Sequence, residues 1–527
     1  MKLIALLTLC AVILSPVTAC SNILVSPAAS EDGNVLIGAN DDSAKRLGAV
    51  THFPAQKHGP GAMRRIYHFE TGALSGQIPE PNVTHNVMSH ANEHGLVIAE
   101  TTHGGIARLA GGSEDLLDYG SLIMVTLQRA KTAREAARIT QFLPCDDPDS
   151  CMMAPDVLIF AVARGLWNGS TSDPTFSFSD VYDPVTPTGA RFCDARVWYI
   201  FRELADPADF DAEYYLPYAR GFNLTRRMPL FVRPRRKLRR ADVHALLSSK
   251  YEGSELDPSL DGVPPLVATT RHRPGAEVPP PVRALLWWGS DDHAWAPKVP
   301  LFGGATAVHR AYDDGNCSAR LACRAALDLP GSVLTFSWGS AFWVNSAVAR
   351  LVYQDYERAS AVVECAREAF ESWAAPKVES ADKKARRQWA AGDPSAVSAT
   401  LTELALAAGA EAMSRWEKLW MDLLVTFQDG NTASADAHDL LCGCAKASAV
   451  YSTRWLQKVV DDAGDHYRLP SKECASIDAD GHCHPETTAP QKPSSFNVWF
   501  APVPPRRAVA ASNMAPISKL EVRGVMG

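Results

Sequence analysis

The first chemically distinctive position in this sequence is Cys20, which follows a short apolar N-terminal run. Val17, Thr18 and Ala19 precede it, and small residues just before a bond are typical of a signal-peptidase site. Cleavage after Ala19 leaves Cys20 with a free α-amine beside its thiol. The amine can take the thiol proton directly or through one water. The sequence therefore predicts a signal peptide over residues 1–19 and an N-terminal nucleophile at Cys20.

A bacterial lipoprotein cleavage site is the alternative interpretation of the same residues. Cys20 would then carry lipid on its sulfur and an acyl group on its nitrogen, and it could not act as a nucleophile. Twelve cysteines, less Cys10 and Cys20, leave an even number suited to disulfides in an oxidising compartment. Four Asn-x-Ser/Thr sequons begin at Asn82, Asn168, Asn223 and Asn316. We therefore expect a secreted or lysosome-like glycoprotein, with a lipoprotein anchored through Cys20 as the alternative.

Three cysteine pairs are close enough in sequence to close small disulfide loops. They are Cys145 with Cys151, Cys317 with Cys323, and Cys474 with Cys483. Spacing leaves the connectivity open.

The composition is that of a soluble globular protein. The 527 residues are 46% hydrophobic and 21% charged, with a formal net charge of −7. A mildly acidic chain without a dominant basic stripe gives no reason to expect a nucleic-acid partner. No segment after the leader reaches about 18 uninterrupted apolar residues, so we expect no membrane span.

Three histidines, His85, His90 and His94, lie close together in the sequence. Their spacing across a turn matches no metal-binding motif, so we interpret them as surface residues. We accordingly expect neither a metal nor a cofactor.

A β-hairpin is expected to position the residues around Cys20. Residues 21–26 and 35–40 are predicted strands, and residues 30–34 have the composition of a turn. With a four-residue loop, residues whose numbers sum to 63 are expected to pair across the hairpin. A bulge at Pro27 would slip this register by one or two residues.

The predicted register brings two carboxylates to the new N-terminus. Cys20 lies opposite Ser43 and Ser21 opposite Asp42, with Asp41 adjacent. A carboxylate there can hold the α-ammonium group or orient the thiol. A solvated loop is the alternative for these two aspartates.

The rest of the chain reads as mixed helices and strands without repeats. Helices are expected over residues 114–143, 195–204, 241–247, 346–372, 396–427 and 447–463. Strands are expected over residues 283–288, 298–302 and 332–338, with a buried strand after the turn at 92–95 and a polar loop at 180–184. We expect one domain over residues 20–465 and a proline-rich tail over 466–527.

An ordered set of segments resembles the cysteine N-terminal-nucleophile dipeptidases, which are related to secernins and more distantly to penicillin V acylase and bile-salt hydrolase. These segments are Cys20-Ser21-Asn22-Ile23-Leu24-Val25, Asn40-Asp41-Asp42, Asn92-Glu93-His94-Gly95-Leu96, Glu100-Thr101-Thr102, Gly189-Ala190-Arg191-Phe192-Cys193-Asp194, His244-Ala245-Leu246-Leu247 and Val299-Pro300-Leu301-Phe302. The resemblance implies an α+β fold, the αββα sandwich of N-terminal-nucleophile hydrolases, here with added C-terminal helices. It also implies amide-bond hydrolysis without a metal.

The resemblance implies roles for three catalytic residues. Cys20 would attack the carbonyl carbon while its α-amine shuttles the proton. Asp42 aligns with the aspartate that the family places near the nucleophile. Thr102 stands where the acylases place an oxyanion-hole side chain, a kind of donor that typically contributes about 10²–10³ in rate.

The expected substrate is a dipeptide or another small amide. Asp41, Glu100 and Thr101 are the candidate substrate-binding residues, since a carboxylate can bind a free α-amine. An N-acyl amide hydrolase is one alternative. The other is an inactive secreted binding protein, motivated by Ala39, where many relatives have arginine, and by a shortened segment over residues 145–160, where relatives carry several dozen residues. The sequence does not indicate the oligomeric state.

Overall fold

The structure is a computed structural model, and it describes a defined part of the chain. The described residues are 20–40, 47–69, 72–101, 105–106, 109, 116–140, 156–170, 176–251, 253–256, 268–272, 278–313, 333–428, 430–448, 461, 474–477 and 483–485. The predicted signal peptide, Asp41, Asp42, Thr102 and the cysteine pairs 145/151 and 317/323 lie outside them.

Contacts within the chain divide it into two compact units, Met1–Ala449 and Val450–Gly527. In the second unit the structure describes the antiparallel strands β16 (Cys474–Ile477) and β17 (Cys483–Pro485). The predicted domain limit at residue 465 and the predicted tail remain predictions. All elements discussed below belong to the first unit.

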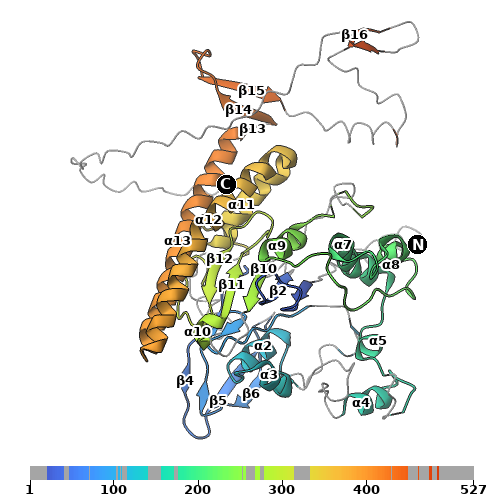
Figure 1. Cartoon of the computed structure of the whole chain (residues 1–527), viewed down its shortest axis with the longest axis vertical. Coiled ribbons are helices and arrows are strands. Elements are labelled where there is room, and N and C mark those ends of the chain that lie inside the picture. Colours follow the sequence, from blue (N-terminus) through green and yellow to red (C-terminus); the bar gives the residue numbers. More distant parts are fainter. Residues whose placement is uncertain are drawn as a thin grey trace, which may run out of the picture. The chain divides into compact units, whose positions relative to one another are not determined.

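A five-stranded antiparallel sheet organises the first unit (Figure 1). Its strands, in spatial order, are β1 (Ser21–Val25), β2 (Val35–Asn40), β10 (Ala268–His272), β11 (Ala284–Trp288) and β12 (Val299–Phe302). Every neighbouring pair is antiparallel. The sheet and the helices packed on it confirm the α+β class.

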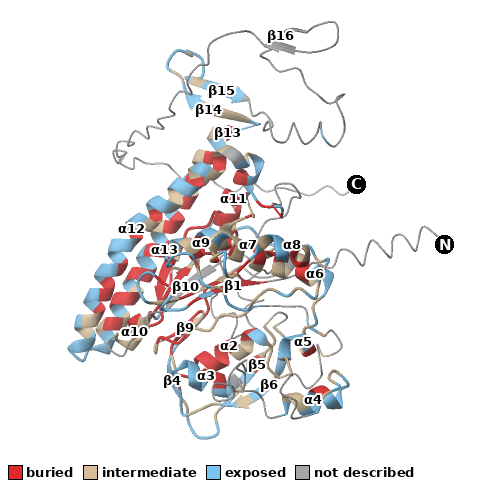
Figure 2. Ribbon diagram, turned by 45° about the vertical axis from the view of Figure 1, so that its right-hand side comes forward, coloured by how far each residue is buried: buried red, intermediate tan, exposed pale blue. Residues whose placement is uncertain are grey.

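Three long helices form the main core with β11 and β12. They are α11 (Ala341–Gln354), α12 (Tyr356–Ala390) and α13 (Pro394–Thr426). Val397, Leu401, Leu404 and Ala408 recur every three or four residues of α13 and are buried, as the helical period requires. Figure 2 shows the resulting buried stripe along α13.

A smaller core holds the β1–β2 hairpin. Ile23, Val25 and Leu36 pack with residues of α7 (Ala195–Leu204) and α9 (Arg240–Ser248). Burial alternates along β1, so Ser21, Ile23 and Val25 face these helices and the intervening side chains do not. The hairpin therefore packs into this core through one face.

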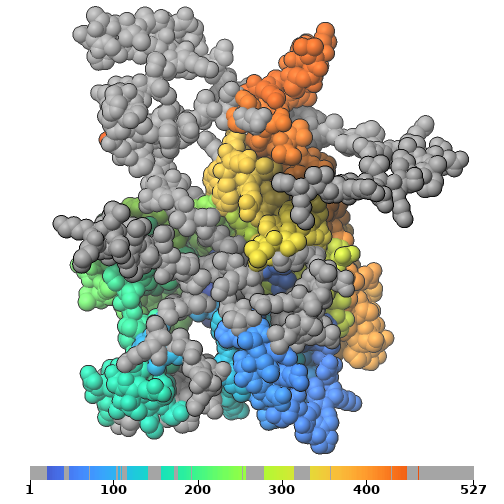
Figure 3. Space-filling view, turned by 180° about the vertical axis from the view of Figure 1, so that it is seen from behind, coloured from blue at the N-terminus to red at the C-terminus, as the bar shows by residue number. Residues whose placement is uncertain are grey.

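The N-terminal strands β3–β9 build a further region with its own core, seen as a continuous blue surface in Figure 3. The strands are β3 (His52–Phe53), β4 (Gln56–Lys57), β5 (Met63–Tyr67), β6 (Leu74–Pro79), β7 (Val83–Thr84), β8 (Val87–Met88) and β9 (Ala91–Asn92). Phe53, Val87 and Leu96 pack there against α2 (Tyr119–Leu127) and α3 (Ala133–Thr140).

The remaining described elements of this unit are short. They are α4 (Val157–Ala163), α5 (Phe178–Tyr182), α6 (Pro187–Gly189), the π-helical turn η2 (Ala190–Asp194), α8 (Ala212–Ala219), α10 (Pro280–Arg283), β13 (Phe427–Gln428), β14 (Asn431–Ala435) and β15 (Cys444–Ser448).

Several predicted elements are confirmed, and each of two long predicted helices is divided into two in the structure. The structure contains α7 at the predicted residues and α9 within one residue of them, with Asp242 accepting the N–H of Arg239 at 2.7 Å. The single helix predicted over 114–143 is wrong, because a new start at Thr132, whose Oγ1 accepts the N–H of Glu135, separates α2 from α3. Asp355 likewise divides the predicted helix 346–372 between α11 and α12, since its backbone, with φ −143° and ψ 67°, is not helical.

Other predictions at short elements are also wrong. Residues 180–182 belong to α5, whose start is capped by Ser177, and not to a loop. In place of the strand expected after residue 95, Val97 makes an isolated bridge to Ala91. In place of the strand expected at 332–338, the described residues 333–339 contain turns and one isolated bridge position at Thr335. Residues 447–448 belong to β15 rather than to the predicted helix 447–463, residue 461 is helical, and the remaining residues of that prediction lie outside the described part of the chain. Strand β10 was not predicted.

Candidate active site

Cys20 lies directly before β1 and is buried, with 7% of its surface exposed. Its Sγ is 3.9 Å from Oε1 of Glu100, a residue 80 positions further along the chain. The side chain of Asn22 donates a hydrogen bond to the carbonyl oxygen of Glu100 at 2.6 Å. The start of β1 and the segment that ends at Thr101 are thus held together, with a carboxylate beside the thiol.

The register of the hairpin differs from the predicted one by two residues. Ser21 pairs with Asn40 and Val25 with Leu36, so paired positions sum to 61. The turn is wider than expected because the carbonyl of Ser26 accepts the N–H groups of Ala29 and Ser30. Asn40, not Asp42, is therefore opposite Ser21, which is the slip anticipated for Pro27.

The cavity on the helix-facing side of the hairpin is too small for a substrate. A cavity of about 20 Å³ lies beside Ser21 and Asn40, lined by residues of α7 and α9. A volume of this size holds about one water molecule. Ser21 Oγ and Asn40 Oδ1 are buried and have no hydrogen-bond partner among the described residues, which a single water would correct.

The opposite side of β1 is the more open one. Asn22 and Thr101 are exposed, and Glu100 is half-buried. The contacts of Cys20 and Asn22 with Glu100 place both side chains on this side. A substrate that reaches the thiol therefore approaches over Asn22 and Thr101. Of the other predicted site residues, Asp41, Asp42 and Thr102 lie outside the described part of the chain.

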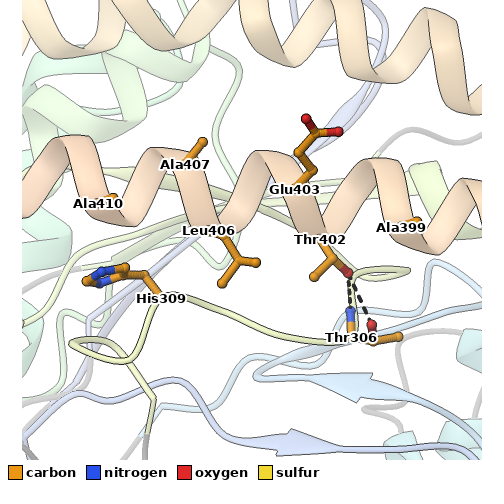
Figure 4. Close-up of a pocket in the computed structure, with 8 residues that line it drawn as sticks. All are labelled: Thr306, His309, Ala399, Thr402, Glu403, Leu406, Ala407 and Ala410. Atoms are coloured by element: carbon orange, nitrogen blue, oxygen red, sulfur yellow. Dashed lines mark hydrogen bonds between the residues drawn. The ribbon is translucent and has the colours of Figure 1, made fainter.

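A surface groove of about 710 Å³ lies away from these residues, between α13 and the loop that follows β12. Figure 4 shows Thr402 and Leu406 directed from α13 toward this loop, where Thr402 accepts a hydrogen bond from the N–H of Thr306 at 2.9 Å. Glu403 points away from the loop. Four of the eight lining side chains are alanine or leucine, the other four are polar or charged, and none is a predicted site residue.

The structure also changes the interpretation of the three histidines. His85, His90 and His94 are half-buried, so the prediction of surface residues is wrong. His85 and His94 are in contact, because the turn after β9 folds back onto the end of β7. His90 instead makes a 2.7 Å hydrogen bond through Nδ1 to the carbonyl of Ile98. Sequence spacing gave no signal for the His85–His94 contact.

Comparison with known proteins bears on the activity. Residues 137–369 match the model of Peptidase family C69. A "Probable dipeptidase" of Latilactobacillus sakei is 23% identical over 256 residues, which cover 46% of this chain. The comparisons support the C69 dipeptidase family. The resemblance inferred from the sequence is thereby confirmed.

Both matches cover part of the chain. The segment matched to the C69 model includes α7, α9 and β10–β12, and it begins well after Cys20. The aligned region spans 47% of the Latilactobacillus sakei protein, about half its length. Among the described residues, no helix combines the length and the apolar character needed to cross a membrane.

Proposed function

We propose that this chain is a secreted cysteine dipeptidase whose nucleophile is Cys20, exposed as the N-terminus by cleavage after Ala19. One observation carries the proposal: the buried Cys20 thiol lies at the start of β1, 3.9 Å from a carboxylate oxygen of Glu100. The C69 match supports peptide-bond hydrolysis. An N-terminal-nucleophile αββα sandwich is part of the proposal, supported by the antiparallel sheet under α7 and α9.

The proposed reaction has two steps. The α-amine of Cys20 accepts the thiol proton, and the thiolate adds to the scissile carbonyl carbon. The carbon–nitrogen bond then breaks, the departing amine receives the proton from the α-ammonium group, and a thioester to Cys20 remains. Water, deprotonated by the same α-amine, hydrolyses the thioester and releases the second product.

Glu100 suits a binding role better than a role as the base. A carboxylate beside a thiol disfavours a second negative charge on the sulfur. The same carboxylate attracts an ammonium group, either that of Cys20 or the free α-amine of a dipeptide. We propose that Glu100 holds this ammonium group. Asp42 as the aspartate near the nucleophile, Thr102 as the oxyanion donor, and Asp41 and Thr101 as substrate contacts complete the proposed site.

The first test measures both the cleavage after Ala19 and the hydrolysis of dipeptides. N-terminal sequencing of the secreted protein should read from Cys20, and the purified protein should release amino acids from a panel of dipeptides. Cys20→Ala should abolish release, whereas Cys365→Ala, which removes an exposed free thiol on α12, should not change it. Full activity of Cys20→Ala, or a lipidated Cys20 in the intact mass, would overturn the proposal. N-acylated amino acids assayed in parallel separate the acylase alternative.

The second test concerns Glu100. Glu100→Gln keeps the size of the side chain and removes its charge. Loss of a charge-assisted contact of about 1.5–3 kcal/mol should lower kcat/KM roughly 10–100-fold for dipeptides. N-acetylated dipeptides, which lack the α-ammonium group, should show no such loss if Glu100 binds the substrate amine. Equal losses for both substrates would instead assign Glu100 to the amine of Cys20.

A further inference from the structure

We propose that His85, Glu93 and His94 form a binding site for a divalent transition-metal ion, with Zn²⁺ as the best-suited ion. One ligand atom from each residue lies within 4.8 Å of the others. The site is separate from Cys20, and neither the family match nor the proposed hydrolysis requires it.

The distances among the three side chains are close to those of a metal shell. His85 Nδ1 is 3.1 Å from His94 Nε2 and 3.9 Å from Glu93 Oε1. A tetrahedral zinc site with bonds near 2.0–2.2 Å places its ligand atoms about 3.3 Å apart. Small side-chain rotations would therefore admit the ion, and a water molecule would complete the fourth position.

The backbone positions of the three ligands are fixed by two buried asparagines. Asn92 accepts the N–H of His94 at 3.0 Å and donates to the carbonyls of Leu127 and Ala130. Asn86 donates to the carbonyls of Gly303 and Ala305, and its N–H binds Glu93 Oε1 at 2.9 Å. Sites whose ligands are held by such surrounding hydrogen bonds bind metal more tightly.

The chemistry of the donors favours a transition metal. A neutral imidazole offers a nitrogen lone pair to a metal, and burial is the largest cause that lowers the pKa of both His85 and His94. Two imidazole nitrogens with one carboxylate suit zinc, whereas calcium and magnesium prefer oxygen ligands. The His85 side chain is 12% exposed and that of Glu93 is 35% exposed, which leaves a path for the ion from solvent.

Metal binding would join the end of β7 to the turn after β9. This turn continues through Leu96 to Glu100, the residue beside the Cys20 thiol. The site is thus placed to stabilise the segment that carries Glu100. Metal binding would therefore act on the structure of this segment. Binding can be measured without any substrate.

The test is direct titration of the full chain, freed of affinity tags and of bound metal by a chelator, with Zn²⁺ against a chromophoric competitor. We expect one saturable Zn²⁺ per chain and a rise in melting temperature. His85→Gln and His94→Gln should each weaken binding at least about 100-fold, because changes around a ligand alone cost 10–100-fold. His438→Gln removes an exposed histidine of the β14–β15 connection and should change nothing.

Three further measurements test which side chains bind the ion. Cys20→Ala should bind Zn²⁺ like the wild type, and bound Co²⁺ should show d–d bands without thiolate charge transfer, which excludes a cysteine ligand. Glu93→Gln, which can still accept from Asn86, tests the carboxylate without removing that hydrogen bond. No saturable binding by the wild type, or unchanged binding in all three ligand variants, would show that His85 and His94 form only a hydrogen-bonded pair.

Discussion

His244 and His293 face each other in the core between α9 and the loop that joins β11 to β12, with their ring centroids 4.5 Å apart. Burial, followed by the positive charge of Lys298, holds both pKa values well below the usual 6.5. Glu371 lies 3.6 Å from Nδ1 of His244, but the pKa of His244 remains lowered. Both rings are therefore neutral in the folded protein.

This pair predicts a loss of stability in acid. The unfolded chain binds protons at these histidines as the pH falls below about 6.5, and the folded chain does not. The free energy of unfolding should therefore fall by up to about 1.4 kcal/mol per pH unit for each histidine. His293→Leu should flatten this dependence. Urea unfolding at pH 7.5, 6.5 and 5.5 compares the two proteins.

The comparison with the variant is needed because Asp291 gives the free energy of unfolding the opposite dependence on pH. Burial raises its pKa to about 6, so its contribution to stability improves as the pH falls. That contribution is common to the wild type and to His293→Leu, and it cancels in their difference. Parallel curves for the two proteins would contradict the assignment of a neutral His293.

At the end of β9, the side chain of Asn92 connects the following turn to α2 and to the segment before α3. Both amide hydrogens of Asn92 bind carbonyls at the end of α2 and in the connection to α3, at 2.8 and 2.7 Å. Its Oδ1 accepts the N–H groups of His94 and Leu96. Asn92 has no exposed surface, so these groups have no access to bulk water.

Replacement of Asn92 should therefore be costly. Each buried group left without a partner costs about 1–3 kcal/mol, so Asn92→Ala should lower the free energy of unfolding by at least about 3 kcal/mol. Asn34→Ala, at a partly exposed turn position whose side chain makes no hydrogen bond among the described residues, should change it by less than about 0.5 kcal/mol. Urea unfolding measures both, and equal effects would refute the role of Asn92.

A close approach between elements is visible where α13 passes the loop after β12. A Cβ at Gly409 would overlap the Cβ of His309. Gly409→Ala should destabilise the protein by about 1–3 kcal/mol despite the better helix propensity of alanine. In a His309→Gly background the same change should instead stabilise by up to about 1 kcal/mol. A double-mutant cycle by chemical denaturation checks this reversal of sign.

At the scale of the whole molecule, the hydrophobic clusters of the described residues all lie between Ile23 and Phe427. Their main cluster joins β11 and β12 to α11–α13, so the C-terminal helices complete the core of the sheet. The predicted catalytic hairpin and these helices consequently belong to one compact unit.

A chain that ends at Ala449 should keep the stability of this unit. Because the buried apolar surface of the described residues lies before that residue, the melting temperature should stay within about 2 °C of that of the full chain. At about 2.1 cal/mol/K per residue, this shift corresponds to less than about 2 kcal/mol for a unit of this size. Differential scanning calorimetry of both chains is the measurement. A large drop would mean that Val450–Gly527 contributes to the fold.

The sequence by itself determined the elements whose pattern is local. Alternation predicted β1 and β2, the helical period predicted α7 and α9, and ordered segments identified the dipeptidase family. The prediction of a leader that ends before Cys20 also required only neighbouring residues. These features follow from periods of two and 3.6 residues, which a short window of sequence contains.

Only the tertiary structure decided which distant residues meet. The contact of Cys20 with Glu100 and that of His85 with His94 depend on how β7, β9 and the segment to Thr101 fold onto the sheet. The two-residue change of register depends on hydrogen bonds within the turn at Ser26. Such contacts arise from packing and from buried hydrogen bonds between separate elements, and no local period encodes them. The sequence could therefore predict a nucleophile but not the groups that surround it.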